Sequence, residues 1–123
     1  MRTKLLTAMV LVGMVVASSF IPSSLPAGQN GMAMRSVYPN PFTISTTFQL
    51  TMPKSGNIRI AVFDLLGRHM KTLFQGEHEQ GKDNIFWDGN DDSGKPVIPG
   101  IYICSLFADN NMVTSVKVVK IPA

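Results

Sequence analysis

Residues 57–64 read NIRIAVFD, and this stretch indicates the class of the fold. Ile58, Ile60 and Val62 occupy alternate positions, with the charged Arg59 between the first two. In an extended chain this alternation places the three apolar side chains on one face, which predicts a β-strand with one buried face. No segment from residue 36 onward sustains the apolar spacing of an amphipathic helix. We therefore expect an all-β fold.

Outward from this strand, Gly, Pro, Asn and Asp cluster about every eight to twelve residues, as they do between short strands. In the turns, Gly67 after Asp64 and the Asp109-Asn110-Asn111 run supply residues that tolerate a left-handed backbone. About seven short strands in about 90 residues are typical of an immunoglobulin-like antiparallel β-sandwich. Strands are predicted at residues 35–38, 46–51, 57–64, 69–74, 84–88, 101–108 and 112–119.

The strand at residues 101–108, IYICSLFA, is apolar at both sets of alternating positions. This pattern predicts the central strand of its sheet, covered by neighbours on each side. Cys104 shares a face with Tyr102 and Leu106, so we expect a buried structural thiol. It is the chain's only cysteine, and an intramolecular disulfide is therefore excluded.

The first residues differ from the rest of the chain. A basic start at Arg2 and Lys4 precedes a 13-residue apolar run at residues 5–17 that ends in small residues. A bilayer span needs about 20 apolar residues, and Ser18 interrupts the run earlier. The pattern predicts a cleaved signal peptide at residues 1–19, a flexible linker at 20–35 and one domain at 36–123. Contact with a membrane is then expected only through the signal peptide before its cleavage.

The charge of the chain excludes one class of partner. Eleven Lys and Arg against eight Asp and Glu give a net charge of +3, and removing Arg2 and Lys4 leaves 3 − 2 = +1. A nucleic-acid binder clusters basic residues on one face, and a nearly neutral domain has no such footprint. We therefore expect no nucleic-acid partner.

Residues 89–95 match the spacing of a phosphate-binding loop, GxxxxGK. Pro96 stands where such a loop needs the Ser or Thr that holds magnesium, and Asp91 and Asp92 would repel phosphate. The PVIPG run at residues 96–100 cannot begin the helix whose N-terminus binds the phosphate. We therefore expect no bound nucleotide. The DxxG spacing at residues 64–67, which GTPases also use, is for the same reason not interpreted as a nucleotide-binding motif.

In the same loop, Asp88, Asn90 and Asp92 have the spacing of the ligands at positions one, three and five of a calcium-binding loop. Ser93 stands where an EF-hand needs Gly, and Pro99 where it needs a bidentate Glu, so an EF-hand is excluded. A looser calcium site stays open. The favoured interpretation is a tight loop built by side-chain to backbone hydrogen bonds.

No set of residues predicts catalysis or a metal centre. His69 and His78 have no ligand spacing to each other or to Cys104. No acid, base and nucleophile can be assembled, so we expect no enzyme, no catalytic residue, no metal and no cofactor.

Four short motifs together resemble a known family. The chain resembles the type A C-terminal sorting domain of the bacterial type IX secretion system and the related immunoglobulin-like domain of the flagellar hook-capping protein. The motifs are YPNPF (Tyr38, Pro39, Asn40, Pro41, Phe42), DLLGR (Asp64, Gly67, Arg68), WDGNDDSG (Trp87, Asp88, Gly89, Asp92, Gly94) and GIY (Gly100, Tyr102).

The motif residues have expected structural roles. Pro39 and Pro41 predict an extended, polyproline-like segment along a sheet edge that does not need ladder hydrogen bonds. Trp87 is expected between the sheets, and Arg68 is expected to pair with Asp64 across its turn. Turn positions are expected at Asp64, Gly67, Asp88, Gly89 and Gly100.

The resemblance implies a recognition module without chemistry of its own. Such a domain is read by secretion and attachment proteins of the outer membrane after export, which implies transit through the periplasm and a final place outside the cell or on its surface. A signal peptide favours this route over flagellar export. The family's domain normally follows a large passenger, whereas only residues 20–35 are expected between signal and domain here.

The alternatives are a free-standing structural or adhesive module that binds glycan or another surface polymer, and a fragment of a longer gene product. Exposed aromatic residues arranged on one face would favour the adhesive module.

Overall fold

The computed structural model describes residues 31–123. The predicted signal peptide at 1–19 and residues 20–30 of the predicted linker lie outside the described residues. Within the described part, no helix is long and apolar enough to span a membrane. The strands are β1 (Ala33–Tyr38), β2 (Thr46–Met52), β3 (Gly56–Asp64), β4 (His69–His78), β5 (Gly81–Trp87), β6 (Gly100–Ala108) and β7 (Asn111–Lys120).

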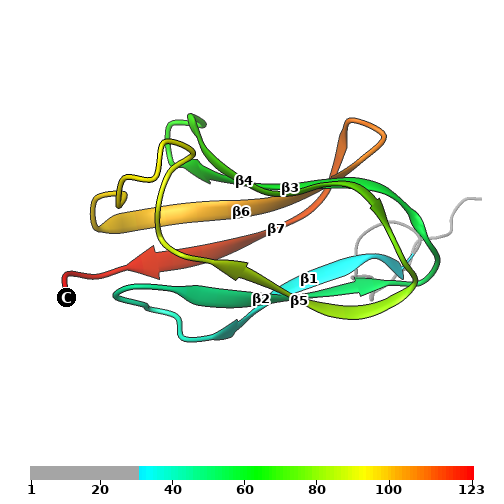
Figure 1. Ribbon diagram of the computed structural model, residues 1–123, viewed down its shortest axis with the longest axis horizontal. Coiled ribbons are helices and arrows are strands. Elements are labelled where there is room, and N and C mark those ends of the chain that lie inside the picture. The colour runs from blue at the N-terminus through cyan, green and yellow to red at the C-terminus, as the bar shows by residue number, and fades with distance from the viewer. Residues whose placement is uncertain (1–30) are drawn as a thin grey trace, which may run out of the picture.

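The strands form two antiparallel sheets that pack face to face (Figure 1). One sheet has three strands in the order β1-β2-β5, and the other has four in the order β4-β3-β6-β7. The prediction of an all-β, immunoglobulin-like sandwich with about seven strands is confirmed. β6 lies between β3 and β7, as the apolar pattern of residues 101–108 predicts.

The core forms from the alternating residues of both sheets. Ile60 and Val62 of β3 are 0% exposed, and so are Phe48 and Leu50 of β2. Cys104 is also fully buried with a free thiol, which confirms the expected structural role. Burying side chains of this size contributes about 1.5 to 3 kcal/mol each, and this burial holds the domain together in the absence of a disulfide.

The connections follow two different rules. Residues 65–68 join β3 to β4 within one sheet, and Asp109 and Asn110 join β6 to β7 with φ of 54° and 65°, as the local turn signals predict. Residues 53–55 instead carry the chain from β2 to the other sheet, because β2 pairs with β1 and β5. Local sequence does not encode that choice of partner.

β1 begins before its predicted start. The strand starts at Ala33, so residues 33–35 belong to the sandwich although the sequence predicts a flexible linker up to residue 35. Met34 is only 6% exposed and pairs with Leu50 of β2. The burial of this side chain is the physical reason for the earlier start.

The outer face of the four-stranded sheet is covered by its own side chains. The rings of Phe63 and Phe107 meet edge to face at 6.1 Å, and the Arg59 guanidinium lies 4.4 Å from the centre of the Phe107 ring. Ala61 and Ser105, which pair with each other, are 0% and 3% exposed. The outer face of β6 is thus shielded from solvent as well as its inner face, which explains why this strand is apolar at both sets of alternating positions.

Candidate functional site

All four motifs lie at one end of the sandwich, where the C-terminus also lies (Figure 1). Because every strand is antiparallel to its neighbours, the connections alternate between the two ends. We call residues 39–45, 64–68, 88–100 and 120–123 the motif end. Residues 53–55, 79–80 and 109–110 form the opposite end.

The YPNPF segment is bound to the last strand. The backbone N–H of Phe42 donates to the carbonyl of Val119 at 2.8 Å, and Ile121 N–H donates to the Phe42 carbonyl at 2.8 Å. The Asn40 side chain donates to the Lys117 carbonyl at 3.1 Å and accepts from Val119 N–H at 3.0 Å. The prediction of an edge segment without ladder hydrogen bonds is therefore wrong, because this segment extends the edge of β7.

The geometry of the two prolines also differs from the prediction. The chain bends at Asn40 and Pro41 instead of running extended, and both Xaa-Pro peptide bonds are cis. The Thr46 hydroxyl donates to the Pro39 carbonyl. The side chain of Phe42, at 1% exposure, is buried by this path.

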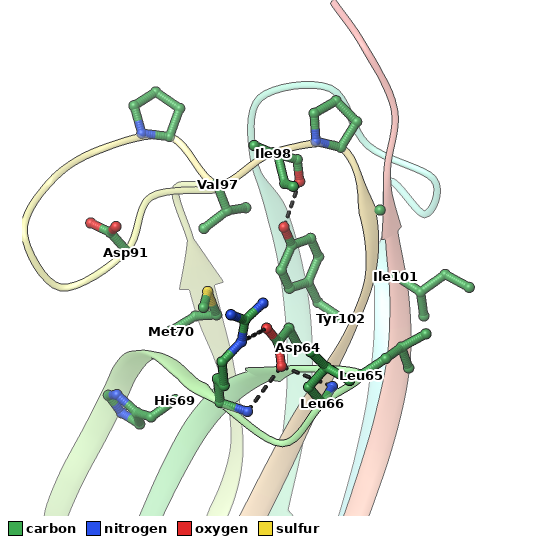
Figure 2. A pocket seen from close by; sticks show the side chains of 14 residues that line it. Asp64, Leu65, Leu66, His69, Met70, Asp91, Val97, Ile98, Ile101 and Tyr102 are labelled. Carbon is green, nitrogen blue, oxygen red and sulfur yellow. Dashed lines mark hydrogen bonds and ion pairs between the residues drawn. The ribbon is translucent and has the colours of Figure 1, made fainter.

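Aromatic residues from three motifs meet inside the motif end. The Trp87 ring lies 5.3 Å from Phe42 and 5.6 Å from Tyr102, in tilted and edge-to-face contacts. Trp87 is fully buried, as predicted, and its indole N–H donates to the Asn90 carbonyl at 2.9 Å. The Tyr102 hydroxyl donates to the carbonyl of Ile98 (Figure 2). These contacts fix the loop at residues 88–100 to the core.

Gly89 is required at its position. Its φ is +77°, and a Cβ built there would lie 2.4 Å from the backbone oxygen of Ile44. Any side chain would push the YPNPF connection away from the WDG loop. Gly67 has a similar φ of +83° with open space around it. The two glycines thus serve a close backbone approach and a turn, respectively.

Asp64 builds the β3–β4 turn. Its Oδ1 accepts the N–H groups of Leu66 and Arg68 at 2.9 Å each, and its Oδ2 accepts from Arg68 Nε at 2.6 Å, as predicted for this pair. These hydrogen bonds, led by that of the Arg68 N–H, lower the pKa of Asp64. Leu65 and Leu66 are displayed at the tip with 64% and 78% exposure.

Asp91 has the same role in the loop at residues 88–100. Its Oδ1 accepts from the hydroxyl of Ser93 at 2.6 Å and from the N–H groups of Ser93 and Lys95 at 2.9 Å and 3.0 Å. Hydrogen bonding, led by the Ser93 hydroxyl, lowers the pKa of Asp91. Sequence reasoning did not select Asp91 as a motif residue. The Asp-x-Ser-Gly spacing, which is typical of a side-chain-capped turn, could have identified it.

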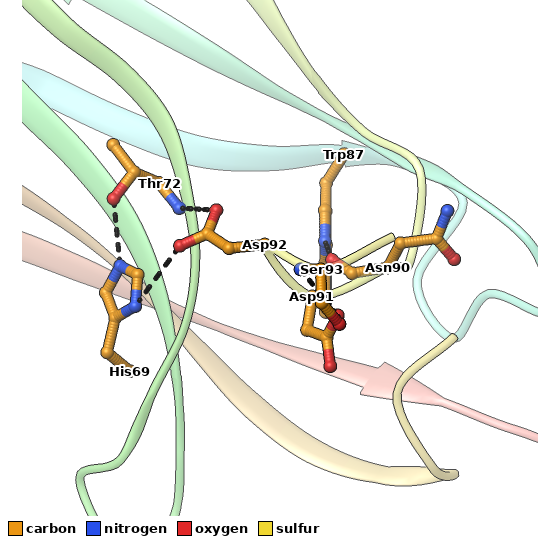
Figure 3. A network of polar contacts seen from close by, with 7 residues as sticks. All are labelled: His69, Thr72, Trp87, Asn90, Asp91, Asp92 and Ser93. Atoms are coloured by element: carbon orange, nitrogen blue, oxygen red, sulfur yellow. Dashed lines mark hydrogen bonds and ion pairs between the residues drawn. The ribbon is translucent and has the colours of Figure 1, made fainter. Parts of the chain in front are cut away.

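Asp92 joins this loop to β4 (Figure 3). Its N–H donates to the Met70 carbonyl at 2.9 Å, and its Oδ1 accepts from Thr72 N–H at 3.2 Å. Its Oδ2 lies 3.5 Å from Nδ1 of His69, whose other ring nitrogen contacts the Thr72 hydroxyl at 2.8 Å. Asp92 therefore covers part of the open edge of β4.

The three residues with calcium spacing have separate structural partners. Asp88 accepts from Asn90 N–H within its own turn at 3.0 Å, whereas Asp92 turns toward β4. Among residues 31–123, no group of three or more His, Cys, Asp or Glu side chains is placed to hold a metal ion. The hydrogen bonds agree with the favoured interpretation of a tight loop. Gly94 and the residues after it lead into β6 and not into a helix.

Burial raises the pKa of the Cys104 thiol, so this sulfur is a poor nucleophile. His69 and His78 bind neighbouring acids separately, at Asp92 and at Asp83. Cys104 is thus part of the core, and each of the two histidines has a neighbouring acid as its partner.

The motif end carries a set of exposed aliphatic side chains among its polar residues. Two open grooves, of about 600 Å³ and 470 Å³, lie beside the ridge formed by residues 96–99, which they share. Figure 2 shows the residues that line the first of them. The ridge is held from below because Lys120 Nζ donates to the Val97 carbonyl at 2.7 Å. The exposed aliphatic side chains that line the grooves are Ile44, Leu65, Leu66, Ile98, Ile101 and Ile121.

These aliphatic residues come from four separate segments of the chain. Ile98 is 77% exposed and Ile44 is 69% exposed, and Ile98 lines both grooves. A contiguous exposed apolar surface on a folded domain marks a site of interaction with another macromolecule. Sequence reasoning assigned the turn and loop residues but missed this surface, because the segments meet only in the fold.

Comparisons with known proteins agree with the fold. A family model described as the secretion system C-terminal sorting domain matches residues 36–121. No curated protein matches the chain.

Two solved structures are similar to the chain. Dimeric latent PorU from Porphyromonas gingivalis superposes with a TM-score of 0.52 and 20% identity, over 73% of this chain and 10% of that chain. FlgD from P. aeruginosa superposes with a TM-score of 0.51 and 23% identity, over 79% of this chain and 77% of that chain. The chain thus corresponds to a small part of PorU and to most of the FlgD structure.

At these identities the two structures support the fold alone. The family model covers most of the chain and all four motifs. The chain therefore belongs to the family of secretion-system C-terminal sorting domains.

Proposed function

We propose that this protein is a substrate of the type IX secretion system whose sandwich is recognised, through the motif end, by outer-membrane proteins of that system. The observation that carries this proposal is the gathering of four separate motifs and an exposed aliphatic surface at one end of the sandwich. A recognition surface must be displayed with little mobility, and the side chains of Asp64 and Asp91 fix the loops that display it.

The proposed route has two steps. The signal peptide at residues 1–19 takes the chain across the inner membrane, and the domain folds in the periplasm, where its core does not need a disulfide. Outer-membrane proteins of the secretion system then bind the folded motif end, and the protein is released or stays attached to the cell surface.

The domain is proposed to act by recognition without catalysis. The carboxylates of the motif end accept hydrogen bonds from backbone N–H groups of their own loops, as Asp64, Asp88 and Asp91 do. Such groups maintain the shape of a surface and are not free to transfer protons to a ligand.

A reporter enzyme inserted between residues 30 and 31 of the full chain tests this proposal in a host with a type IX system. We expect the reporter in the medium or on the cell surface. The matched control carries the same insertion but lacks residues 31–123, and its reporter should stay in the periplasm.

Reporters that both cross the inner membrane and are then distributed equally would contradict recognition of the domain. A reporter that stays in the cytoplasm in both would contradict the signal peptide and leave recognition to be measured with a known signal. The two parts of the proposal therefore fail separately.

A further inference from the structure

The outer face of the three-stranded sheet has no other described element over it. In Figure 1 the layer of β1, β2 and β5 packs on the four-stranded sheet through one side only. Phe48 and Leu50 of β2 fill that inner side with 0% exposure, so the residues between them point outward. The strand register then gives the outer residues as Ala33, Arg35, Tyr38, Thr47, Gln49, Thr51, Lys82, Asn84 and Phe86.

Two aromatic rings stand in one row on this face. Tyr38 pairs with Thr47, and Thr47 pairs with Phe86, so the three side chains lie side by side across the sheet. Tyr38 is 75% exposed and Phe86 is 63% exposed. They are the only aromatic residues among the exposed large apolar residues of the described chain. Two strand spacings separate the strands that carry the rings by about 10 Å.

The other sheet shows that this exposure is not forced by the fold. On the outer face of the four-stranded sheet, Phe63 and Phe107 contact each other and Arg59 covers one ring. Tyr38 and Phe86 are instead kept apart by Thr47, whose side chain is too small to cover them. Each ring therefore offers an open flat surface for stacking.

The polar residues around the rings match a ligand with many hydroxyl groups. Gln49 and Asn84 pair with each other in the next row, and each amide carries both donors and acceptors. Arg35 Nε donates to Gln49 Oε1 at 3.3 Å, which directs the amide. Flat apolar surfaces beside amides fit sugar rings, whose faces are apolar and whose edges carry hydroxyl groups.

The positive charge of this face favours acidic saccharides over neutral ones. Arg35 and Lys82 bring two positive charges to the outer residues, and no Asp or Glu is among them. This charge complements a ligand with carboxylate groups. We propose that the outer face of the three-stranded sheet binds an acidic polysaccharide, with sugar rings stacked on Tyr38 and Phe86 and carboxylates facing Arg35 and Lys82. This face borders the motif end, because Tyr38 is the first residue of YPNPF, but the proposal does not depend on the function of the motif end.

Affinity electrophoresis of the purified full chain tests the proposal, with gels that contain polygalacturonate or its methyl-esterified form. We expect retardation by polygalacturonate, which added salt weakens, and little retardation by the ester. Phe86→Ala should weaken binding about tenfold, because one stacking surface is lost. Arg35→Gln combined with Lys82→Gln should remove the preference for the acidic form.

Met112→Ala is the matched control, because Met112 is 58% exposed and belongs to the other sheet. It should bind as the original chain does. Phe86 is exposed, so its replacement should leave thermal unfolding unchanged, and loss of binding is then not loss of fold.

Unchanged mobility of the original chain in both gels would overturn the proposal, and so would equal binding by Phe86→Ala. Equal retardation by the methyl ester would overturn the assignment of an acidic ligand. A dimer in light scattering that Phe86→Ala abolishes, without glycan binding, would assign the face to a second copy of the chain.

Discussion

The two ends of the sandwich are built in different ways. At the opposite end, residues 79–80 and 109–110 turn the chain within two positions, and Asp109 and Asn110 do so through backbone torsion. At the motif end, the connections are fixed by side chains that bind backbone groups, from Asn40, Asp64 and Asp91. The difference teaches that the motifs maintain the shape of one surface, whereas the short connections of the opposite end only turn the chain back within its sheet or carry it to the other sheet.

The largest expected effect comes from Phe42→Ala. Phe42 is 1% exposed and contacts Trp87, so its removal leaves a cavity and frees the YPNPF segment from the core. We expect a loss of about 3 to 5 kcal/mol in the free energy of unfolding, measured by urea denaturation. Met112→Ala at the opposite end should change it by less than about 0.5 kcal/mol. Equal stability of the two variants would remove the contrast between the ends.

Gly89→Ala should have the next largest effect. Its Cβ would lie 2.4 Å from the Ile44 oxygen, and the residue has φ of +77°. We expect a loss of about 3 kcal/mol in the free energy of unfolding. Gly67→Ala is the matched control, because its φ is +83° and nothing lies within 4 Å. It should cost only about 1 kcal/mol, and a cost as large as that of Gly89→Ala would refute the close approach.

Asn40→Ala tests the hydrogen bonds that one side chain of the motif end makes with β7. The substitution removes two hydrogen bonds, to the Lys117 carbonyl and from Val119 N–H. We expect a loss of about 1 to 2 kcal/mol in urea denaturation. Hydrogen exchange at Val119 should also become faster. Asn57→Ala, an exposed position near the opposite end, should stay within about 0.5 kcal/mol of the original chain.

The smallest expected effect is the response of the two ends to pH. Burial of the His78 ring opposes its charge, but hydrogen bonds to Asp83 and the Glu79 carbonyl outweigh it and raise the pKa of His78. The stability from His78 is thus fully present below its unfolded pKa of about 6.5 and is lost as the pH rises through the folded value. The lowered pKa of Asp91 has the opposite consequence: its contribution is present above 3.8 and is lost as the pH falls through the folded value.

Thermal unfolding of His78→Gln and Asp91→Asn across the acidic and neutral range measures this difference. The gap between the original chain and His78→Gln should shrink as the pH rises above neutrality. The gap for Asp91→Asn should shrink only in acid. Gaps that do not vary with pH would contradict both assignments.

Much of the fold is predictable because strands have a local signal. The alternation around Ile60 and the apolar pattern around Cys104 predict buried faces correctly. The partners of β2 are not predictable in this way, since residues 53–55 carry the chain to the other sheet and pairing is a non-local property. The early start of β1 was missed because one inward residue, Met34, lies in a stretch of linker-like composition.

The candidate site is predictable only in part. Asp64, Gly67 and Trp87 were placed correctly, because turns and a large core residue follow from residue type. The path of YPNPF was not, because Asn40 finds its partners on β7, far along the chain. The aliphatic surface has no signature in the sequence, since its residues come from four segments that are far apart along the chain and meet only in the fold.

The most direct test of a motif end that serves recognition is secretion of the reporter-bearing chain with Leu66→Ser and Ile98→Ser together. Both side chains are more than three-quarters exposed, at 78% and 77%, so the fold should remain intact in circular dichroism. The matched control is Met112→Ser at the opposite end, where an apolar residue is also exposed. We predict that the double variant stays in the periplasm while Met112→Ser is secreted normally. Secretion of a folded double variant at the original level would contradict recognition through the motif end.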